Sequence, residues 1–140
     1  MNFTSVNKIF EESIRKNWDR PAISNYQGVT LHYRDMARRI AKLHIVFEEC
    51  GLKKGDKVAL CSRNQANWVV SFLAAMTYGA VPVPLMHEFK PNNIKHLVNH
   101  SEAKILFVDE VIWEGLSELE MDGLQAIIQV NTFKLLYAAN

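Results

Sequence analysis

Histidine supplies the first residues in this sequence that could do chemistry. His96 and His100 are four residues apart on a predicted helix, so both imidazole rings can reach one metal ion. A metal site also needs a third ligand, and the nearest carboxylate, Glu102, comes after the predicted end of the helix. Two exposed helix histidines are the simpler interpretation, and we assign no metal ligand.

Two further groups are candidates for binding a ligand. His87 follows the predicted strand 81–85 at its C-terminal end, where ligand sites gather in open α/β sheets. Arg34, Arg38 and Lys42 form a row along a predicted helix and could contact phosphate. A surface loop residue and a solvated helix face are the preferred interpretations of these two features.

The sequence gives no support for a nucleophilic centre. Cys50 precedes a helix-ending glycine, Cys61 lies in a predicted buried strand, and neither has neighbours that would lower the pKa of its thiol. Ser62 or Asn64 is predicted to cap the helix that begins at Ala66, because serine and asparagine side chains accept bonds from the first helical N–H groups. We therefore assign no catalytic residue.

Glycine spacing excludes the common phosphate-binding loops. The chain has six glycines, and no two are closer than four positions. Both the G-x-G-x-x-G fingerprint and the G-x-x-x-x-G-K loop are therefore absent. Both loops work by bringing backbone N–H groups close to a phosphate, which leaves us no cofactor-binding residue to assign.

Composition is that of an ordinary globular domain. Of the 140 residues, 49% are apolar and 22% are charged, and the net charge of +1 predicts no nucleic-acid partner. The two cysteines make no disulfide framework. The longest apolar stretch, residues 68–75, is far shorter than the roughly 18 residues of a membrane helix. We expect one domain over residues 1–140, a cytoplasmic location and no transmembrane segment.

Hydrophobic periodicity predicts an α/β fold. A helix over 3–16 precedes two alternating strands, 22–26 and 29–33, which form a short hairpin before a helix over 34–49. Strands and helices then alternate, with strands at 58–61, 81–85, 104–108 and 126–130, and helices at 66–78, from Pro91 onward and at 111–119. This alternation is typical of a parallel sheet flanked by helices. The two prolines of 81–85 suit a sheet edge, and the tail 132–140 has no assigned element.

Five segments also occur in a recognisable order. They are Leu31–Met36 (LHYRDM), Gly51–Val58 (GLKKGDKV), Asn64 with Trp68, Ala75–Leu85 (AMTYGAVPVPL) and Ser101–Val108 (SEAKILFV). Over residues 20–110 their order and spacing resemble the motifs of the adenylate-forming (AMP-binding) enzymes, which include acyl-CoA synthetases, luciferases and the adenylation domains of peptide synthetases. The nearest resemblance is to long-chain fatty acyl-CoA ligases. Asp35, His32 and Thr77–Tyr78 depart from the usual residues.

The resemblance implies a partial N-terminal subdomain of an ATP-dependent fatty acid–CoA ligase. Such a ligase makes an acyl-adenylate and pyrophosphate from a carboxylate and ATP, then an acyl-CoA and AMP, so ATP, Mg²⁺ and coenzyme A are implied for the full-length parent. The family's Ser/Thr/Gly-rich phosphate loop and catalytic lysine have no counterpart here, so the chain alone is expected to be inactive.

Two other functions stay open at this stage. One is a stand-alone, non-catalytic binding or assembly domain of the same fold, and the other is a flavodoxin-like nucleotide binder, which the missing phosphate loop disfavours. For a parent ligase the partner is the remainder of its chain. An isolated piece should expose a sheet edge, and we expect self-association by edge pairing or by exchange of the tail 132–140.

Overall fold

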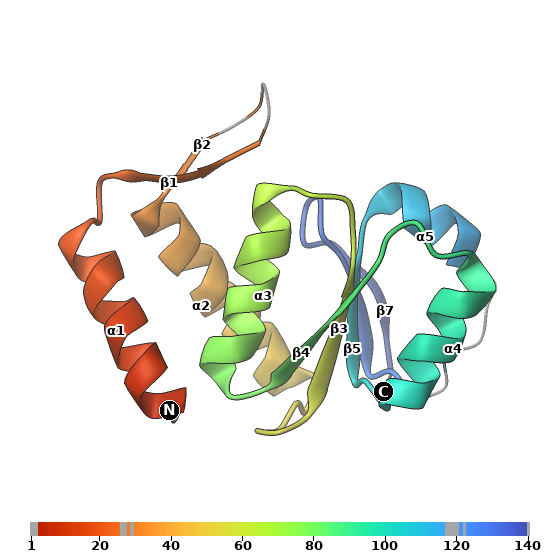
Figure 1. Ribbon diagram of the computed structural model, residues 1–140. Coiled ribbons are helices and arrows are strands. Elements are labelled where there is room, and N and C mark those ends of the chain that lie inside the picture. The colour runs from red at the N-terminus through yellow and green to blue at the C-terminus, as the bar shows by residue number, and fades with distance from the viewer. Residues whose placement is uncertain (1–2, 26–27, 29, 117–120, 122, 140) are drawn as a thin grey trace.

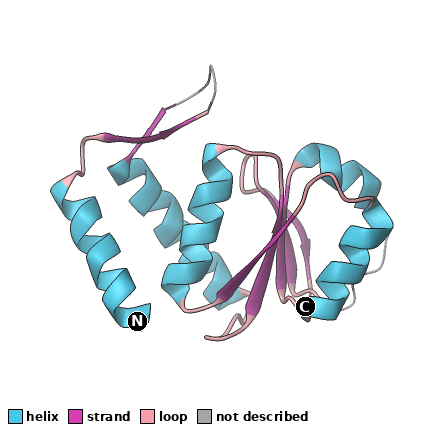
Figure 2. Ribbon diagram, in the orientation of Figure 1, coloured by secondary structure: helices cyan, strands magenta, loops and turns pink. Residues whose placement is uncertain are grey.

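A mixed sheet with helices on both faces forms the centre of the molecule (Figures 1 and 2). The computed structural model describes residues 3–25, 28, 30–116, 121 and 123–139. Its elements are α1 (Phe3–Lys16), β1 (Pro21–Ser24), β2 (Thr30–His32), α2 (Tyr33–Glu49), β3 (Lys57–Cys61), α3 (Ala66–Tyr78), β4 (Val81–Leu85), α4 (Pro91–Ser101), β5 (Ile105–Val108), α5 (Glu110–Leu116), β6 (Ala126–Gln129) and β7 (Leu135–Ala138). Two predicted strand positions, 26 and 29, the residue 27 between the predicted strands, and the predicted helical residues 117–119 lie outside the described part of the chain.

The main sheet has the order β4-β3-β5-β6-β7. Its first four strands are parallel, as the alternation of strands and helices predicts, and β4 occupies one edge. The prediction that 126–130 is the last strand was wrong, because the tail forms β7, antiparallel to β6. The chain reverses through a turn in which Phe133 has a φ of +60°, and this turn contains none of the usual Gly or Pro signals.

Two hydrophobic cores lie on opposite faces of this sheet. Helices α2 and α3 cover one face, and α4 and α5 cover the other (Figure 1). Successive residues of β3 alternate between the cores: Val58 and Leu60 point into the first, Ala59 and Cys61 into the second. No described helix is both long and apolar enough to span a membrane.

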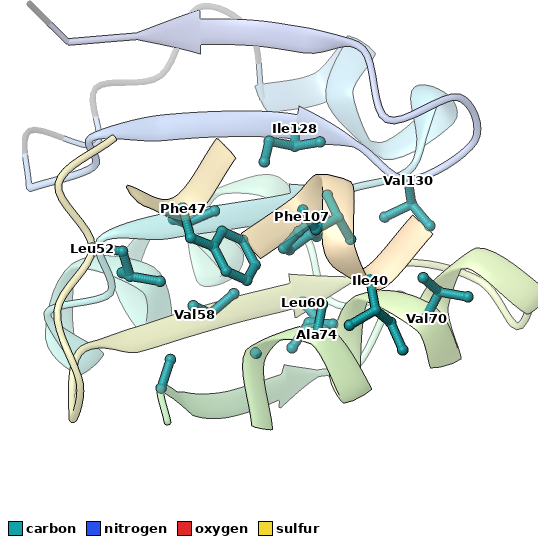
Figure 3. Packing of buried hydrophobic residues seen from close by; sticks show 14 of the residues in the cluster. Ile40, Phe47, Leu52, Val58, Leu60, Val70, Ala74, Phe107, Ile128 and Val130 are labelled. Carbon is teal, nitrogen blue, oxygen red and sulfur yellow. The ribbon is translucent and has the colours of Figure 1, made fainter. Parts of the chain in front are cut away.

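Aromatic packing joins α2 to the sheet. Phe47 is fully buried, and its ring meets Phe107 of β5 edge-on with centroids 6.0 Å apart (Figure 3). The ring of Tyr78 from α3 meets Phe47 at 5.3 Å in the same manner. Edge-to-face pairs of this kind add to the stabilisation that apolar burial already provides. Phe47 therefore ties both helices of this face to the central strand.

The N-terminal elements attach to the start of α3. The short antiparallel hairpin β1–β2 precedes α2, and Asn25, just after β1, accepts a hydrogen bond through Oδ1 from the backbone N–H of Ala66 at 2.6 Å. The prediction that Ser62 or Asn64 caps α3 was wrong. Ser62 instead donates to the carbonyl of Arg63. The acceptor lies 41 residues away in the sequence, where a local motif cannot reveal it.

Replacing Phe47 tests how far the fold depends on this packing. Phe47→Ala should lower the free energy of unfolding by about 3–5 kcal/mol, because it removes a buried ring from between two helices and a strand. Urea denaturation followed by circular dichroism measures the change. Ile45→Ala, on the same helix but with 57% of the residue exposed, should shift it by no more than about 0.5 kcal/mol. Equal losses from both variants would contradict the assignment.

Candidate functional site

Polar side chains gather where the parallel strands end. Arg63 follows β3, His87 follows β4, Asp109 follows β5 and Asn131 follows β6. The carboxyl ends of parallel strands share one edge of the sheet, which is where ligands bind in folds of this class. This carboxyl edge is the candidate functional site.

Asp109 is a fully buried carboxylic acid at the carboxyl edge. None of its surface is exposed, and Oδ2 accepts hydrogen bonds from the backbone N–H of Arg63 at 2.9 Å and from its Nε at 3.2 Å. Oδ1 accepts a third, from the N–H of Ile112 at 2.9 Å. Burial alone raises the pKa of this carboxyl group, but the hydrogen bonds and the Arg63 charge outweigh it and lower the pKa below its usual value.

These bonds make Asp109 a fixed structural anion. Both carboxylate oxygens are engaged, one by the turn after β3 and the other by the first turn of α5. A carboxylate held this way is a poor general base, because taking a proton would cost it bonds made to its charged form. Its arrangement instead holds Arg63 at the edge, with 52% of the arginine side chain exposed.

An asparagine connects the helices to the loop after β6. Asn67, in the first turn of α3, donates through Nδ2 to the carbonyls of Val130 (2.9 Å) and Asn131 (3.1 Å). Its Oδ1 accepts a hydrogen bond from Nη1 of Arg39 on α2. Asn131 in turn accepts the N–H of Glu110 at 3.0 Å, which links the same loop to α5. The network fixes the positions of four elements at the carboxyl edge.

A cavity of about 520 Å³ opens beside this network. It lies between α2 and the β6–β7 turn, and its apolar lining comes from Leu43, Val46, Cys50, Ile128, Phe133 and Leu135. Arg39, Lys42 and Glu49 supply its charged groups. Of the row interpreted from sequence as a solvated face, Arg38 and Lys42 are exposed, and Arg34 binds the exposed carboxylate of Asp19 at 2.8 Å.

The histidine candidates do not form a ligand set. His87 pairs through Nε2 with Oε1 of Glu88 at 2.9 Å, and the two side chains are 38% and 62% exposed. The rings of His96 and His100 stack with centroids 6.0 Å apart. Across the described ranges of the chain, no three His, Cys, Asp or Glu side chains converge on one point, and we assign none of these residues to the Mg²⁺ ion implied by the resemblance.

Neither cysteine is an activated nucleophile. Burial, with smaller effects of Asp109 and Glu88, raises the pKa of the Cys61 thiol to about 12. Burial and the nearby Glu49 also raise the pKa of Cys50. Both cysteines are free, and both thiols stay protonated near neutral pH.

Sequence reasoning missed the three residues that organise the carboxyl edge. Asp109 had a usable signal, because an aspartate between a buried strand and a helix is a common N-terminal cap. For Asn67 and Arg39 the neighbouring sequence contained no such signal. Their partners lie 63 and 28 residues away, and both look like ordinary helix surface residues.

The anchoring role of Asp109 predicts a pH-dependent stability difference. Its folded pKa is below the unfolded value, so its contribution is complete above the unfolded pKa and disappears as the pH falls through the folded pKa. At pH 7, Asp109→Asn should therefore have a free energy of unfolding about 1–3 kcal/mol lower than that of the native chain. This difference in the free energy of unfolding should become smaller below about pH 4.

Urea denaturation at a series of pH values measures this gap. Asp19→Asn is the matched control, because the Asp19 side chain is 82% exposed and its removal should leave the unfolding midpoint near the native one throughout. A gap for Asp109→Asn that stays constant down to pH 3 would show that the carboxylate charge contributes nothing.

Comparison with known proteins places this fold in a family. A family model described as AMP-binding enzyme matches residues 10–137. The chain is 34% identical over 79 residues to fatty acyl-CoA synthetase A of Dictyostelium discoideum, covering 56% of this chain and 12% of that protein. It is 26% identical over 108 residues to surfactin synthase subunit 2 of Bacillus subtilis (strain 168), covering 77% of this chain and 3% of that one.

A solved structure gives the same result. The N-terminal subdomain of Klebsiella oxytoca NpsA, in complex with 3-hydroxybenzoyl-AMSN, superimposes with a TM-score of 0.73 and 25% sequence identity. The match covers 91% of this chain and 31% of that one. The chain thus spans only a small part of the length of the relatives it matches. The family match over nearly the whole chain, together with the shared fold, shows that this protein belongs to the AMP-binding, adenylate-forming enzyme family.

Proposed function

We propose that this chain is the N-terminal scaffold segment of an ATP-dependent fatty acid–CoA ligase. In the full-length parent, a fatty carboxylate and ATP would give an acyl-adenylate and pyrophosphate, and coenzyme A would then take the acyl group and release AMP. The rest of the parent chain is the principal partner in this proposal. A cytoplasmic location, favoured by two free cysteines, belongs to the proposal as well.

The ordered set of five motifs, together with the 34% identity to a fatty acyl-CoA synthetase, carries this proposal. Membership of the family supports the adenylating step in general. The fatty acid is the finer part of the proposal, because a surfactin synthase subunit is also among the relatives.

In this proposal the described residues support the active centre and do no chemistry themselves. Among the described residues, the one fully buried carboxylate, Asp109, is held by backbone N–H groups, and the thiols are protonated. No step involving Mg²⁺ is assigned to these residues, because no ligand set for the ion is found among them. Their contribution is a rigid sheet whose carboxyl edge is fixed by Asp109 and Asn67.

A carboxylate panel tests the proposed activity. The protein encoded by the whole reading frame that contains these 140 codons is incubated with ATP, Mg²⁺ and one acid at a time, and pyrophosphate release is measured. Long-chain fatty acids should give the highest kcat/KM, and added coenzyme A should yield the acyl-CoA. The 140-residue chain, assayed in parallel as a control, should release no pyrophosphate above background.

The possible outcomes separate the two levels of the proposal. A preference for amino acids or aryl acids would overturn the fatty acid assignment and leave adenylation standing. No pyrophosphate with any acid, or a stop codon directly after codon 140, would favour a non-catalytic binding or assembly domain.

A further inference from the structure

A cleft of about 400 Å³ lies between α1 and α2, which stand side by side at the N-terminal end of the molecule (Figure 1). Helix α1 contributes the large apolar side chains Phe10 and Ile14 to it, whereas α2 contributes Ala37 and Ala41. These two alanines are four residues apart and therefore share one face of α2. Because their side chains are too short to fill the space opposite α1, the space stays open. Ala41 is exposed, so solvent reaches this α1–α2 cleft.

One lining residue of the α1–α2 cleft carries a buried acceptor without a donor. The amide nitrogen Nδ2 of Asn7 donates to the carbonyl of Thr77 at 3.1 Å, which fixes the orientation of the amide group. The other end of that amide, Oδ1, is buried and accepts no hydrogen bond from the described residues. Such an acceptor costs stability, because it has lost its bond to water and gained no other. An additional N–H or O–H donor would satisfy it.

His44 supplies a second acceptor to the α1–α2 cleft. Its Nε2 lies 3.0 Å from the carbonyl oxygen of Ala74 and 3.0 Å from Oγ1 of Thr77. A carbonyl oxygen only accepts, and the Thr77 hydroxyl already donates to Leu73 at 2.7 Å, so Nε2 carries the proton. Burial lowers the pKa of His44 and outweighs the opposing effects of the Ala74 carbonyl and Glu48. The ring is therefore neutral near pH 7, and Nδ1 is left as an acceptor.

We propose that the α1–α2 cleft binds a small neutral molecule with an apolar body and an N–H or O–H donor, the class to which phenols and indoles belong. The donor bonds Oδ1 of Asn7, and the body packs between α1 and α2. The charged lining residues Glu11 and Arg15 form an ion pair with each other, so neither requires a charged ligand. The inference concerns these helices alone and does not rest on the proposed enzymatic function.

The size and lining of the α1–α2 cleft set the expected affinity. Its volume falls within the roughly 300–1,000 Å³ of small-molecule sites, and a cavity of about 150 Å³ already accepts benzene. A two-ring molecule therefore fits. Contact with Phe10, Ile14 and Ile40 supplies most of the affinity, and the bond to Asn7 supplies selectivity. For a molecule of this size we expect a Kd of about 1 mM.

NMR titration of the ¹⁵N-labelled chain with indole and with benzofuran tests the site. The two probes have nearly the same shape, but benzofuran has an oxygen where indole has its N–H and so cannot donate. Indole should shift the amide resonances of residues 7–14 and 37–44 and bind about tenfold more tightly than benzofuran. Equal affinities would show that water satisfies Oδ1 of Asn7 and would overturn the proposal. Shifts confined to other parts of the chain would overturn it too.

Two variants of α2 locate the binding in the α1–α2 cleft. Ala41→Leu adds a larger side chain inside it and should weaken indole binding by about tenfold or more. Arg38→Leu is the matched control, because it places the same side chain at an exposed position of the same helix outside the cleft, and it should keep the native Kd. A native Kd for Ala41→Leu would contradict the assignment.

A variant of Asn7 tests which residue receives the donor. Asn7→Ala should bring the Kd of indole to that of benzofuran, because it removes the acceptor that distinguishes the two probes. The ratio of the two Kd values is the readout, since this variant also loses the bond to Thr77 that helps to hold α1. A ratio that remains about tenfold would show that Asn7 does not accept the bond.

Discussion

Strands β3 and β5 are sealed from water on both faces, and the positions of the other elements follow from this. Residues 58–61 and 105–108 have no measurable exposure, so their side chains need apolar partners above and below the sheet. Helices α2 and α3 meet this need on one side, and α4 and α5 on the other. No charged group can lie along these strands, because an unpaired charge there would pay a large desolvation cost. Charges are therefore confined to the strand ends.

Asp109 shows how a charge is accommodated at such an end. It is the residue directly after β5, fully buried, and its carboxylate is stabilised by two backbone N–H groups and by Arg63. The bonds that keep it ionised also position the turn after β3 and the start of α5. Asn67 acts similarly without charge, because its amide bonds two carbonyls of the loop after β6. Both residues use their polar atoms to hold the turns and helix starts at the carboxyl edge in place.

The features that were predictable from sequence are those encoded by neighbouring residues. The apolar stripe of α2, at Met36, Ile40, Leu43 and Phe47, repeats at helical spacing, and all four side chains are buried. The unalternating run in β3 likewise indicated burial on both faces. The predictions that were wrong concern features that depend on residues distant in the sequence. The cap of α3 comes from Asn25, and β7 forms only because β6 offers it hydrogen-bonding partners after a turn with Phe133 in a left-handed conformation. Asn67 and Arg39 were not predicted because their partners also lie far away in the sequence. Asp109, by contrast, caps the helix that follows it directly, so the sequence near it did contain a signal.

The two edge strands of the main sheet differ in the backbone N–H donors that they carry. At the β4 edge the N–H of Val81 donates to the carbonyl of Asp56, so the alternate positions Pro82 and Pro84 face outward and offer no N–H group. Strand β7 contains no proline, and Leu135 lines the cavity beside α2, whose wall holds both apolar and charged residues. Within the described main sheet, proline therefore removes backbone donors from the β4 edge and from no other strand.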